Sequence, residues 1–314
     1  MLAEQVRSGL VETVHDGALA VVDPGGELVA WSGEIDRPYF FRSAAKPFQA
    51  AVCNRLGAGL DREKLALACA SHDAEPVHVA LVEAMLAEAG LDEEQLKCPP
   101  AWPLRASAAR RLIAGGARQP RRLWNNCSGK HAAMLRAVQA CGWDLEDYLS
   151  LDHPLQRQIV ASMRELAGEV EPVGVDGCGA PVFATTATRM AQAFARLGSD
   201  EELAPLFDAM HAYPALVSGY GNVDAEVATR LNVVSKRGAA GCVGLAFRSG
   251  YGIAVKVWDG NSEAAGIAIV AGLDQLGLLS DDARGGLDRI ARPLIQGGGK
   301  PVGVFRPLLE LTTR

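Results

Sequence analysis

The sequence predicts a mixed α/β fold, with an antiparallel sheet, helices covering it, and a second lobe that is mainly helical. Strand patterns occur near both ends of the chain, and the middle is helical in pattern. Strands and helices do not alternate, which argues against a doubly wound parallel sheet. We expect a sheet-bearing lobe at residues 1–60 and 215–314 and a helical lobe at residues 61–214, interleaved as one unit.

The strands are predicted by apolar runs on either side of turn residues. Residues 17–32 contain two such runs around a Pro-Gly-Gly turn, which predicts a hairpin. Residues 242–247 and 252–258 form a second pair around a Gly-containing turn. Sheet strands therefore come from distant parts of the chain, and we expect the first and last helices to cover the sheet.

The helices are predicted by apolar stretches bounded by Pro or Gly. Pro is favoured in the first turn of a helix and Gly just past its end. These signals predict helices at residues 77–89, 130–140, 154–168 and 184–197, and a last helix follows at residues 263–279.

Composition narrows the class of protein. The 314 residues suit one large or two interleaved domains, and 49% hydrophobic with 22% charged residues is ordinary for a globular protein. A net charge of −6, without a basic run, argues against nucleic acid or an anionic membrane as a partner. The N-terminus lacks the pattern of a signal peptide, and no apolar run reaches membrane-spanning length, so we expect a cytoplasmic protein.

Seven cysteines, an odd number without paired spacing, indicate reduced thiols rather than a disulfide framework. Cys127 and Cys178 differ from the rest because they lie in turns rich in Gly and polar residues. In Asn125–His131 a phosphate loop is excluded, since its first Gly is absent and His131 replaces the Ser or Thr. Cys127 with Lys130 or His131, at a helix start, could instead share a metal with distant Cys178.

Ser43-Ala-Ala-Lys46, at the start of an apolar helical stretch, is a candidate catalytic pair. Residues at i and i+3 lie on the same helix face. If that face is buried, desolvation disfavours the ammonium, so that Lys46 can accept the Ser43 proton. Pro47 places Ser43 at or just before the first turn. The alternative is a helix-capping serine followed by a surface lysine.

Two further polar residues, Ser71 and Lys256, lie next to or within apolar segments. Ser71 lies in a polar turn between two helices, where capping by Ser71 or Asp73 is the alternative interpretation. Lys256 is the only charge in the strand Gly252–Trp258. It either points inward or marks the edge of a sheet.

These clusters, in this order, resemble the rhizobial-type (class 3) L-asparaginases, often labelled L-asparaginase II. The helical-lobe-and-sheet arrangement is also similar to that of serine β-lactamases and penicillin-binding proteins. The resemblance spans nearly the whole chain and rests on five motifs: Arg-Ser-Ala-Ala-Lys-Pro-Phe-Gln at 42–49, Ala-Ser-His at 70–72, Asn-Asn-Cys-Ser-Gly-Lys-His at 125–131, Asp-Gly-Cys-Gly-Ala-Pro at 176–181 and Lys-Val-Trp-Asp-Gly at 256–260.

The resemblance implies a β-lactamase-like fold, a homodimer, and hydrolysis of L-asparagine to aspartate and ammonia. It assigns Ser-Lys tandems to Ser43 with Lys46 and to Ser71 with Lys256. It also implies a zinc ion, structural or substrate-orienting, with water as a fourth ligand beside Cys127, Lys130 and Cys178. Ligand chemistry alone favours His131 over Lys130, since an ammonium must lose its proton before it binds a metal.

The expected reaction is acyl transfer from a serine nucleophile, with Arg42, His131 and Asp176 as candidates for binding the substrate's α-carboxylate and α-ammonium. The chain departs from the family pattern at Asp73-Ala74, where Ser or Asn followed by Gly is usual. Alternatives are a related serine hydrolase, such as a glutaminase or β-lactamase-like enzyme, and a non-catalytic zinc-stabilised binding protein.

Overall fold

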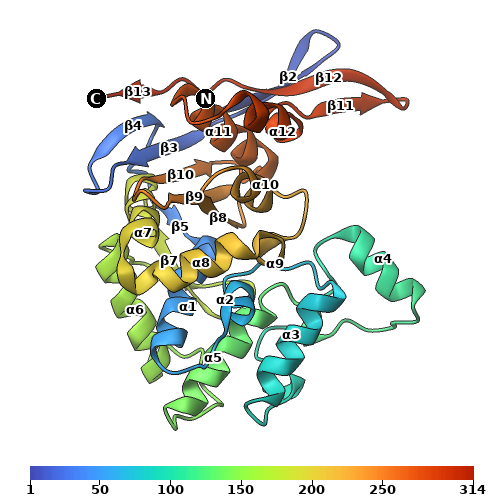
Figure 1. Ribbon diagram of the computed structural model, residues 1–314. Helices are drawn as coiled ribbons and strands as arrows, with labels where there is room; N and C mark the ends of the chain where they lie inside the picture. The colour runs from blue at the N-terminus through green and yellow to red at the C-terminus, as the bar shows by residue number, and fades with distance from the viewer. The chain divides into compact units, whose positions relative to one another are not determined.

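The computed structural model describes residues 1–314, and the chain divides into two compact units. The first unit consists of Met1–Ala44, Thr185–Glu201 and Glu226–Arg314, and the second consists of Ala45–Ala184 and Glu202–Ala225. Sheets dominate the first unit and helices dominate the second (Figure 1). The predicted α/β class, with an antiparallel sheet built from both ends of the chain, is confirmed.

The central sheet of the first unit has six antiparallel strands in the order β13-β4-β3-β10-β9-β8. Both predicted strand pairs belong to it. In the register, Lys256 of β10 lies opposite Ala18 of β3 on one side and Cys242 of β9 on the other. The strands are β13 (Thr312–Thr313), β4 (Leu28–Gly33), β3 (Gly17–Val22), β10 (Gly252–Val257), β9 (Cys242–Phe247) and β8 (Val233–Gly238).

Helices α7 (Ala187–Ser199) and α11 (Ser262–Gln275) cover the two sides of this sheet (Figure 1). Every residue of β10 is buried, as expected for a strand covered on both faces. The sequence predicts that the first and last helices cover the sheet. The last predicted helix, α11, does so, but α7 lies where the first helix was expected. The glycine at position 252 permits close packing of α7 on β10, because a Cβ added there would lie 2.0 Å from the Ala191 carbonyl oxygen of α7.

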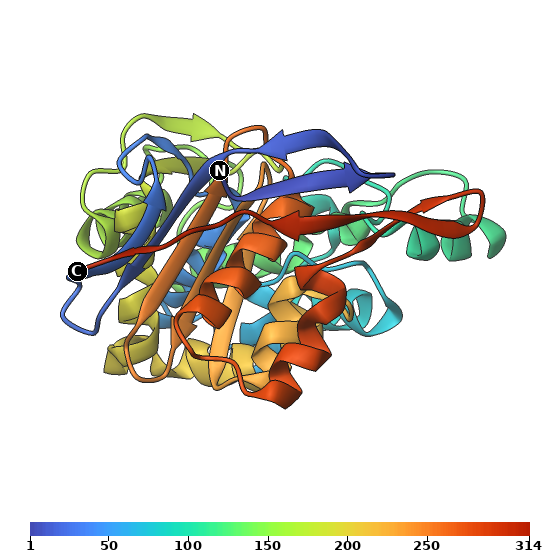
Figure 2. The same ribbon diagram turned by 90° about the horizontal axis from the view of Figure 1, so that it is seen from above.

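A second antiparallel sheet in the first unit, absent from the sequence prediction, has the order β11-β12-β1-β2 (Figure 2). Most of its residues are exposed or half-buried, so its strands lack the apolar runs that mark a buried strand. Helix α12 packs on α11 in the same unit. The elements are β11 (Leu294–Gly297), β12 (Lys300–Pro307), β1 (Ala3–Arg7), β2 (Leu10–His15) and α12 (Asp281–Ala291).

The second unit packs around helix α5 (Ser128–Ala140), which contacts α1, α2, α3 and α6. Its other helices are α1 (Lys46–Arg55), α2 (Arg62–Ala68), α3 (Pro76–Ala87), α4 (Ala106–Ala114), α6 (Pro154–Ala167), α8 (Ala204–Ala212) and α9 (Pro214–Ser218). Strands β6 (Val173–Val175) and β7 (Pro181–Thr185) pair antiparallel.

The remaining elements are β5 (Tyr39–Phe40), α10 (Val223–Arg230) and the 3-10 turns η1 (Arg42–Ala45), η2 (Glu93–Gln95), η3 (Arg122–Trp124) and η4 (Glu201–Leu203). The four helices predicted from Pro and Gly signals and the last predicted helix are confirmed, with ends shifted by a few residues. None of the helices combines the length and apolarity needed to cross a membrane.

The contact between Gly252 and α7 makes a testable prediction about stability. Gly252→Ala should lower the free energy of unfolding by about 2 kcal/mol or more, because the backbone of α7 cannot move away without disturbing the sheet. Gly285→Ala is the matched control, since a Cβ there meets open space in helix α12 and alanine should gain up to about 1 kcal/mol. Urea denaturation measures both, and equal stability of the two variants would contradict the packing described.

Candidate active site

The side chain of Lys46, the first residue of α1, is the centre of the candidate site in the second unit. It is 1% exposed. Its Nζ lies 2.5 Å from the Ala70 carbonyl oxygen, 3.1 Å from Ser71 Oγ and 3.2 Å from the Asn126 carbonyl oxygen. Three acceptors match the three N–H groups of an ammonium. In a neutral amine the two carbonyls would take both N–H groups, and the lone pair would accept the Ser71 hydroxyl proton.

Ser43 lies in η1, the turn that leads directly into α1. The boundary between the two units falls between Ala44 and Ala45, inside this turn. Pro47 occupies the first turn of α1, so Ser43 precedes that turn as predicted. The preceding residue, Arg42, has φ 51°, in the left-handed region that costs a non-glycine residue about 1–2 kcal/mol. Such strain clusters at functional sites.

Ser71 lies in the loop between α2 and α3. Its backbone N–H donates to the Val217 carbonyl oxygen at 2.9 Å, while its hydroxyl contacts Lys46. The next residue, His72, donates its backbone N–H to Asn126 O at 3.3 Å. The loop that carries Ser71 is therefore fixed from two sides, by the C-terminal part of α9 and by the loop that precedes α5.

His72, which the sequence analysis assigned no role, connects the Ser71 loop to α5. Its ring is fully buried, and burial lowers its pKa well below the usual value. Nδ1 accepts the Ala74 backbone N–H at 3.1 Å, so the proton lies on Nε2, which is 2.9 Å from Ser128 Oγ. Ser128 Oγ in turn donates to the Leu123 carbonyl oxygen at 3.0 Å. A neutral His72 thus joins Ser71 to the first residue of α5.

Lys256 lies in the first unit, in the middle of the central sheet. Strand β10 is paired on both sides, so the interpretation of Lys256 as a sheet-edge charge is wrong. Nζ donates to the carbonyl oxygens of Ala240 and Val257, and it lies 5.9 Å from the ring centroids of both Tyr39 and Trp258. Burial lowers the pKa of Lys256. Its pairing with Ser71 stays a prediction.

Cys127, Lys130 and Cys178, the predicted metal ligands, come together in the second unit. Cys127 precedes the first turn of α5, Lys130 lies one turn later, and Cys178 is in the turn between β6 and β7. Lys130 Nζ donates to Cys178 Sγ at 3.1 Å. The three side chains are 3–5% exposed. Two segments that are far apart in the sequence thus bring two thiols and one amine into a closed cluster.

The protonation states of Cys127, Lys130 and Cys178 depend on one another. A hydrogen bond from the Cys127 thiol, together with the Lys130 ammonium, holds the pKa of Cys178 well below its usual range. The same hydrogen bond and burial raise the pKa of Cys127. Burial disfavours the Lys130 ammonium, but the thiolate of Cys178 outweighs this and the pKa of Lys130 rises to about 12. Without a metal, the cluster is therefore an ammonium beside a thiolate and a thiol.

His131 follows Lys130 and borders the same cluster. The Tyr148 hydroxyl accepts the Lys97 backbone N–H at 3.0 Å and lies 2.7 Å from His131 Nδ1. The buried His131 Nε2 makes no hydrogen bond of good geometry, and a weaker hydrogen bond together with the electrostatic interaction between the ring and Cys178 favours the Cys178 thiolate. Burial lowers the pKa of His131. A neutral ring with one unused nitrogen, next to Cys178, is compatible with a further group at the cluster.

The donor set fits zinc. Thiolates are ligands that zinc prefers, and a buried nitrogen without a partner leaves a polar atom for the metal or its water. No group of three or more His, Cys, Asp or Glu side chains forms a metal cluster in the structure. The fit to zinc therefore depends on Lys130 as a ligand, as the resemblance implies.

The three predicted substrate-binding residues occupy different surroundings. Arg42 is half-buried beside Ser43, and Asp176 is half-buried two residues before Cys178, where its carboxylate contributes to raising the pKa of Lys130. The ring of His131 is completely buried. Their roles in substrate binding stay predictions.

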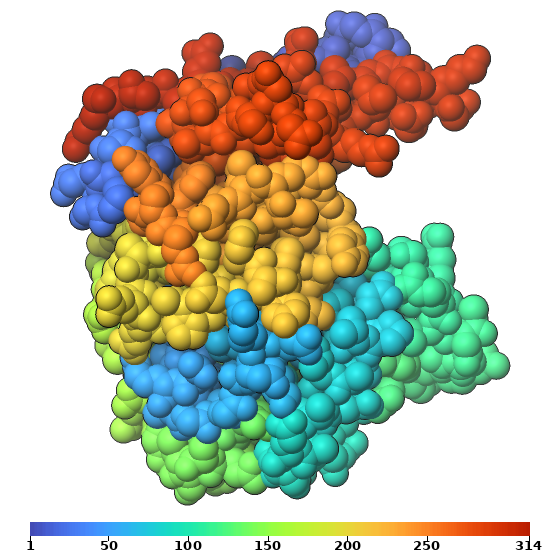
Figure 3. All heavy atoms as spheres, viewed as in Figure 1, coloured from blue at the N-terminus to red at the C-terminus, as the bar shows by residue number.

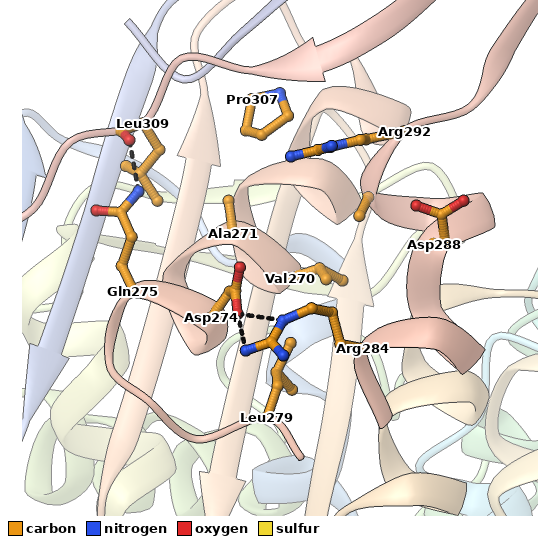
Figure 4. Close-up of a pocket in the computed structure, with 11 residues that line it drawn as sticks. Val270, Ala271, Asp274, Gln275, Leu279, Arg284, Asp288, Arg292, Pro307 and Leu309 are labelled. Carbon is orange, nitrogen blue, oxygen red and sulfur yellow. Dashed lines mark hydrogen bonds and ion pairs between the residues drawn. The ribbon is translucent and has the colours of Figure 1, made fainter. Parts of the chain in front are cut away.

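A separate pocket of about 340 Å³ lies in the first unit, between α11, α12 and the segment that contains Pro307 and Leu309 (Figure 4). Arg284 is paired with Asp274 at its wall. The predicted catalytic, metal-binding and substrate-binding residues do not line it. We assign this pocket no part in the candidate site.

The structure thus combines a mixed α/β fold with a buried lysine–serine contact. The family profile of L-asparaginase II matches residues 3–307, nearly the whole chain. The protein belongs to the L-asparaginase II family and is an amidohydrolase. Its resemblance to this family, predicted from five motifs, is confirmed.

Solved structures similar to this one share little sequence with it. A putative β-lactamase from Bacteroides dorei DSM 17855 has 15% identity and a TM-score of 0.45, over 82% of this chain and 93% of that chain. The probable glutaminase ybaS has 15% identity and a TM-score of 0.42, over 83% and 85%. Mglu in its native form in the presence of 4.3M NaCl has 17% identity and a TM-score of 0.41, over 89% of this chain and 66% of that chain. Comparison with curated protein sequences finds no match.

The buried histidines predict how stability depends on pH. Burial lowers the folded-state pKa of His72, His78 and His131, whereas the unfolded chain binds these protons near pH 6.5. Below about pH 6.5 the unfolded state therefore binds protons that the folded state does not bind, and the free energy of unfolding decreases as the pH falls. The decrease is up to about 1.4 kcal/mol per pH unit for each histidine.

His72→Gln, which retains an N–H donor for Ser128, should reduce this slope by the equivalent of about one proton. Urea denaturation between pH 7.5 and 5 measures the slope. A slope identical in the variant and the wild type would show that His72 is not a buried neutral group.

Proposed function

We propose that the protein is an L-asparaginase, which hydrolyses the side-chain amide of L-asparagine to L-aspartate and ammonia. The observation that carries the proposal is the contact of the buried Lys46 amine with the Ser71 hydroxyl, in a chain of the L-asparaginase II family. A lysine hydrogen-bonded to a serine inside a protein is suited to moving a proton to or from that hydroxyl.

The proposed nucleophile is Ser43, with Lys46 as the base that removes its proton. Lys46 follows Ser43 by three residues, through the η1 turn. Attack on the side-chain amide carbon gives a tetrahedral oxyanion, which backbone N–H groups would stabilise. Its collapse breaks the C–N bond, ammonia leaves with the proton taken from Ser43, and water then hydrolyses the acyl-enzyme.

Ser71 and Lys256 are proposed to complete the proton path. Ser71 already contacts Lys46, so it can pass a proton between the amine and the leaving group. Lys256 has a lowered pKa and two carbonyl acceptors, which suits a residue that gives up and regains a proton.

Arg42 and Asp176 are proposed to bind the α-carboxylate and the α-ammonium of the substrate, because their charges are complementary to these groups. His131 was assigned with them. Because its ring is fully buried beside Cys178, it would act on the substrate only through the metal cluster.

Cys127, Lys130 and Cys178 are proposed to bind zinc, which would add a positive charge that orients nearby groups or polarises a carbonyl oxygen. The Ser-Lys pair makes a zinc-activated water unnecessary, so a structural or substrate-orienting role is preferred. A homodimer is also proposed, from the family resemblance alone.

The nucleophile assignment is tested by ammonia release from L-asparagine and L-glutamine. The wild type should prefer L-asparagine, and Ser43→Ala should lose activity by about 10³-fold or more, because the acyl-enzyme cannot form. Ser107→Ala, in the exposed part of α4, is the control and should retain full activity. Activity that survives in Ser43→Ala but is lost in Ser71→Ala would identify Ser71 as the nucleophile, and release from glutamine alone would identify a glutaminase.

Zinc binding should depend steeply on pH. Lys130 is an ammonium and Cys127 a thiol in the metal-free cluster, while Cys178 is already a thiolate, so binding one zinc ion should release about two protons. Calorimetry in buffers of different ionisation enthalpy measures this number. Cys178→Ser should lose the metal and Cys141→Ser, outside the cluster, should keep it. Retention of one zinc ion per chain by Cys178→Ser would contradict the ligand set.

A further inference from the structure

A second ion pair lies directly beside the Ser71 loop. Asp73, two residues after Ser71, has a side chain that is only 4% exposed. Its Oδ2 accepts a hydrogen bond from Arg105 Nε at 2.7 Å. The Arg105 side chain is 36% exposed, so water can hydrate the cation if its partner is lost. The carboxylate has no such possibility, and the two partners are therefore not equivalent.

Arg105 also holds a third segment. Its Nη2 donates to the Tyr220 carbonyl oxygen at 2.6 Å. The preceding residue, Gly219, has φ +78°, and a Cβ there would lie 2.4 Å from Asp73 Oδ2. Two residues earlier, Val217 accepts the backbone N–H of Ser71. The end of α9 thus contacts Ser71, and the residues that follow it contact the ion pair.

Helix α4, which begins directly after Arg105, is attached to the Ser71 loop by charge rather than by apolar packing. It stands at the edge of the second unit, and Ala108 is its only buried residue (Figures 1 and 3). A second pair joins Arg111 of α4 to Glu75 at 2.5 Å, but both of these side chains are well exposed, at 56% and 34%. Only the Arg105–Asp73 pair is closed to water on its acidic side.

The backbone between the two pairs is strained. Ala74 has φ 50°, in the left-handed region that is unfavourable for a residue with a Cβ. A strained loop relaxes unless its surroundings hold it in place. Ser71, at the start of the loop, would move with it and lose its contact with Lys46.

We propose that Arg105 is a positioning residue for the reaction: by neutralising the buried Asp73 carboxylate, it keeps the Ser71 hydroxyl at the Lys46 amine. A buried charge without a partner is strongly unfavourable, so removal of Arg105 alone should drive Asp73 outward and displace the loop. When the Asp73 charge is removed, alone or together with Arg105, no unpaired buried carboxylate remains, so the loop should keep its position. This inference rests on the proposed function for its catalytic readout.

Four variants test the proposal: Arg105→Met, Asp73→Asn, the double variant, and Arg111→Met as the matched control on the exposed pair. Arg105→Met should lower kcat at least about tenfold with KM changed by less than about threefold, because the substrate-binding groups stay in place. The other three variants should stay within about threefold of the wild type in kcat. Rescue by the second substitution is the result that a general loss of packing cannot give.

Hydrogen exchange of residues 69–75 and 216–222 provides a readout that needs no substrate. Exchange in both segments should be at least about tenfold faster in Arg105→Met, and exchange of residues 69–75 should return close to the wild-type rate in the double variant. If the wild type releases no ammonia from either amide, the proposed function fails and exchange still decides whether the pair holds the loop. The inference is overturned if Arg105→Met keeps the wild-type kcat, if its exchange is unchanged, or if the double variant is as impaired as Arg105→Met.

Discussion

The rest of the candidate site depends on the burial of the Lys46 amine. A buried amine is tolerated only when other groups replace the hydrogen bonds to water that it has lost. Here Ala70, Ser71 and Asn126 supply these oxygens, and they come from two loops that do not follow each other in the sequence. Satisfying one amine therefore fixes the Ser71 loop against the loop that leads into α5. The cluster of Cys127, Lys130 and Cys178 begins one residue after Asn126.

Three of the four buried lysines, Lys46, Lys130 and Lys256, are compensated in three different ways. Lys46 has oxygen acceptors, Lys130 has a thiolate, and Lys256 has two carbonyl oxygens and two aromatic rings. The surroundings of Lys130 and Lys256 shift the lysine pKa in opposite directions. Thiolates raise the pKa of Lys130, whereas burial lowers the pKa of Lys256. One residue type is thus suited to metal binding after proton loss at one place, and to proton transfer at another.

Local patterns predicted much of the fold. Turn residues identified both strand pairs of the central sheet, and Pro and Gly identified the helix ends, because these signals act over a few residues. The β11-β12-β1-β2 sheet was missed because its strands are largely exposed. The place of Lys256 in a central strand follows only from pairing on both sides.

The site was predictable to a similar degree. The ordered motifs pointed to Lys46, Ser71 and the cysteine cluster. The partners of these residues were not predictable, because they are distant in sequence: His72 and Ser128 are 56 residues apart, and Asp73 and Arg105 are 32 apart. A histidine or an arginine in an ordinary polar loop carries no local signal of such a contact.

The central claim is that Ser43 forms the acyl-enzyme, while Lys46 removes the Ser43 proton and Ser71 helps to transfer it to the leaving ammonia. The most direct test is to treat the enzyme with a diazoketone analogue of L-asparagine, and to locate the covalent adduct by peptide mapping and mass spectrometry. The account predicts one adduct per chain, on the peptide that contains Ser43, and none in Ser43→Ala. An adduct on Ser71 or Cys178 in the wild type, with Ser43 unmodified, would contradict it.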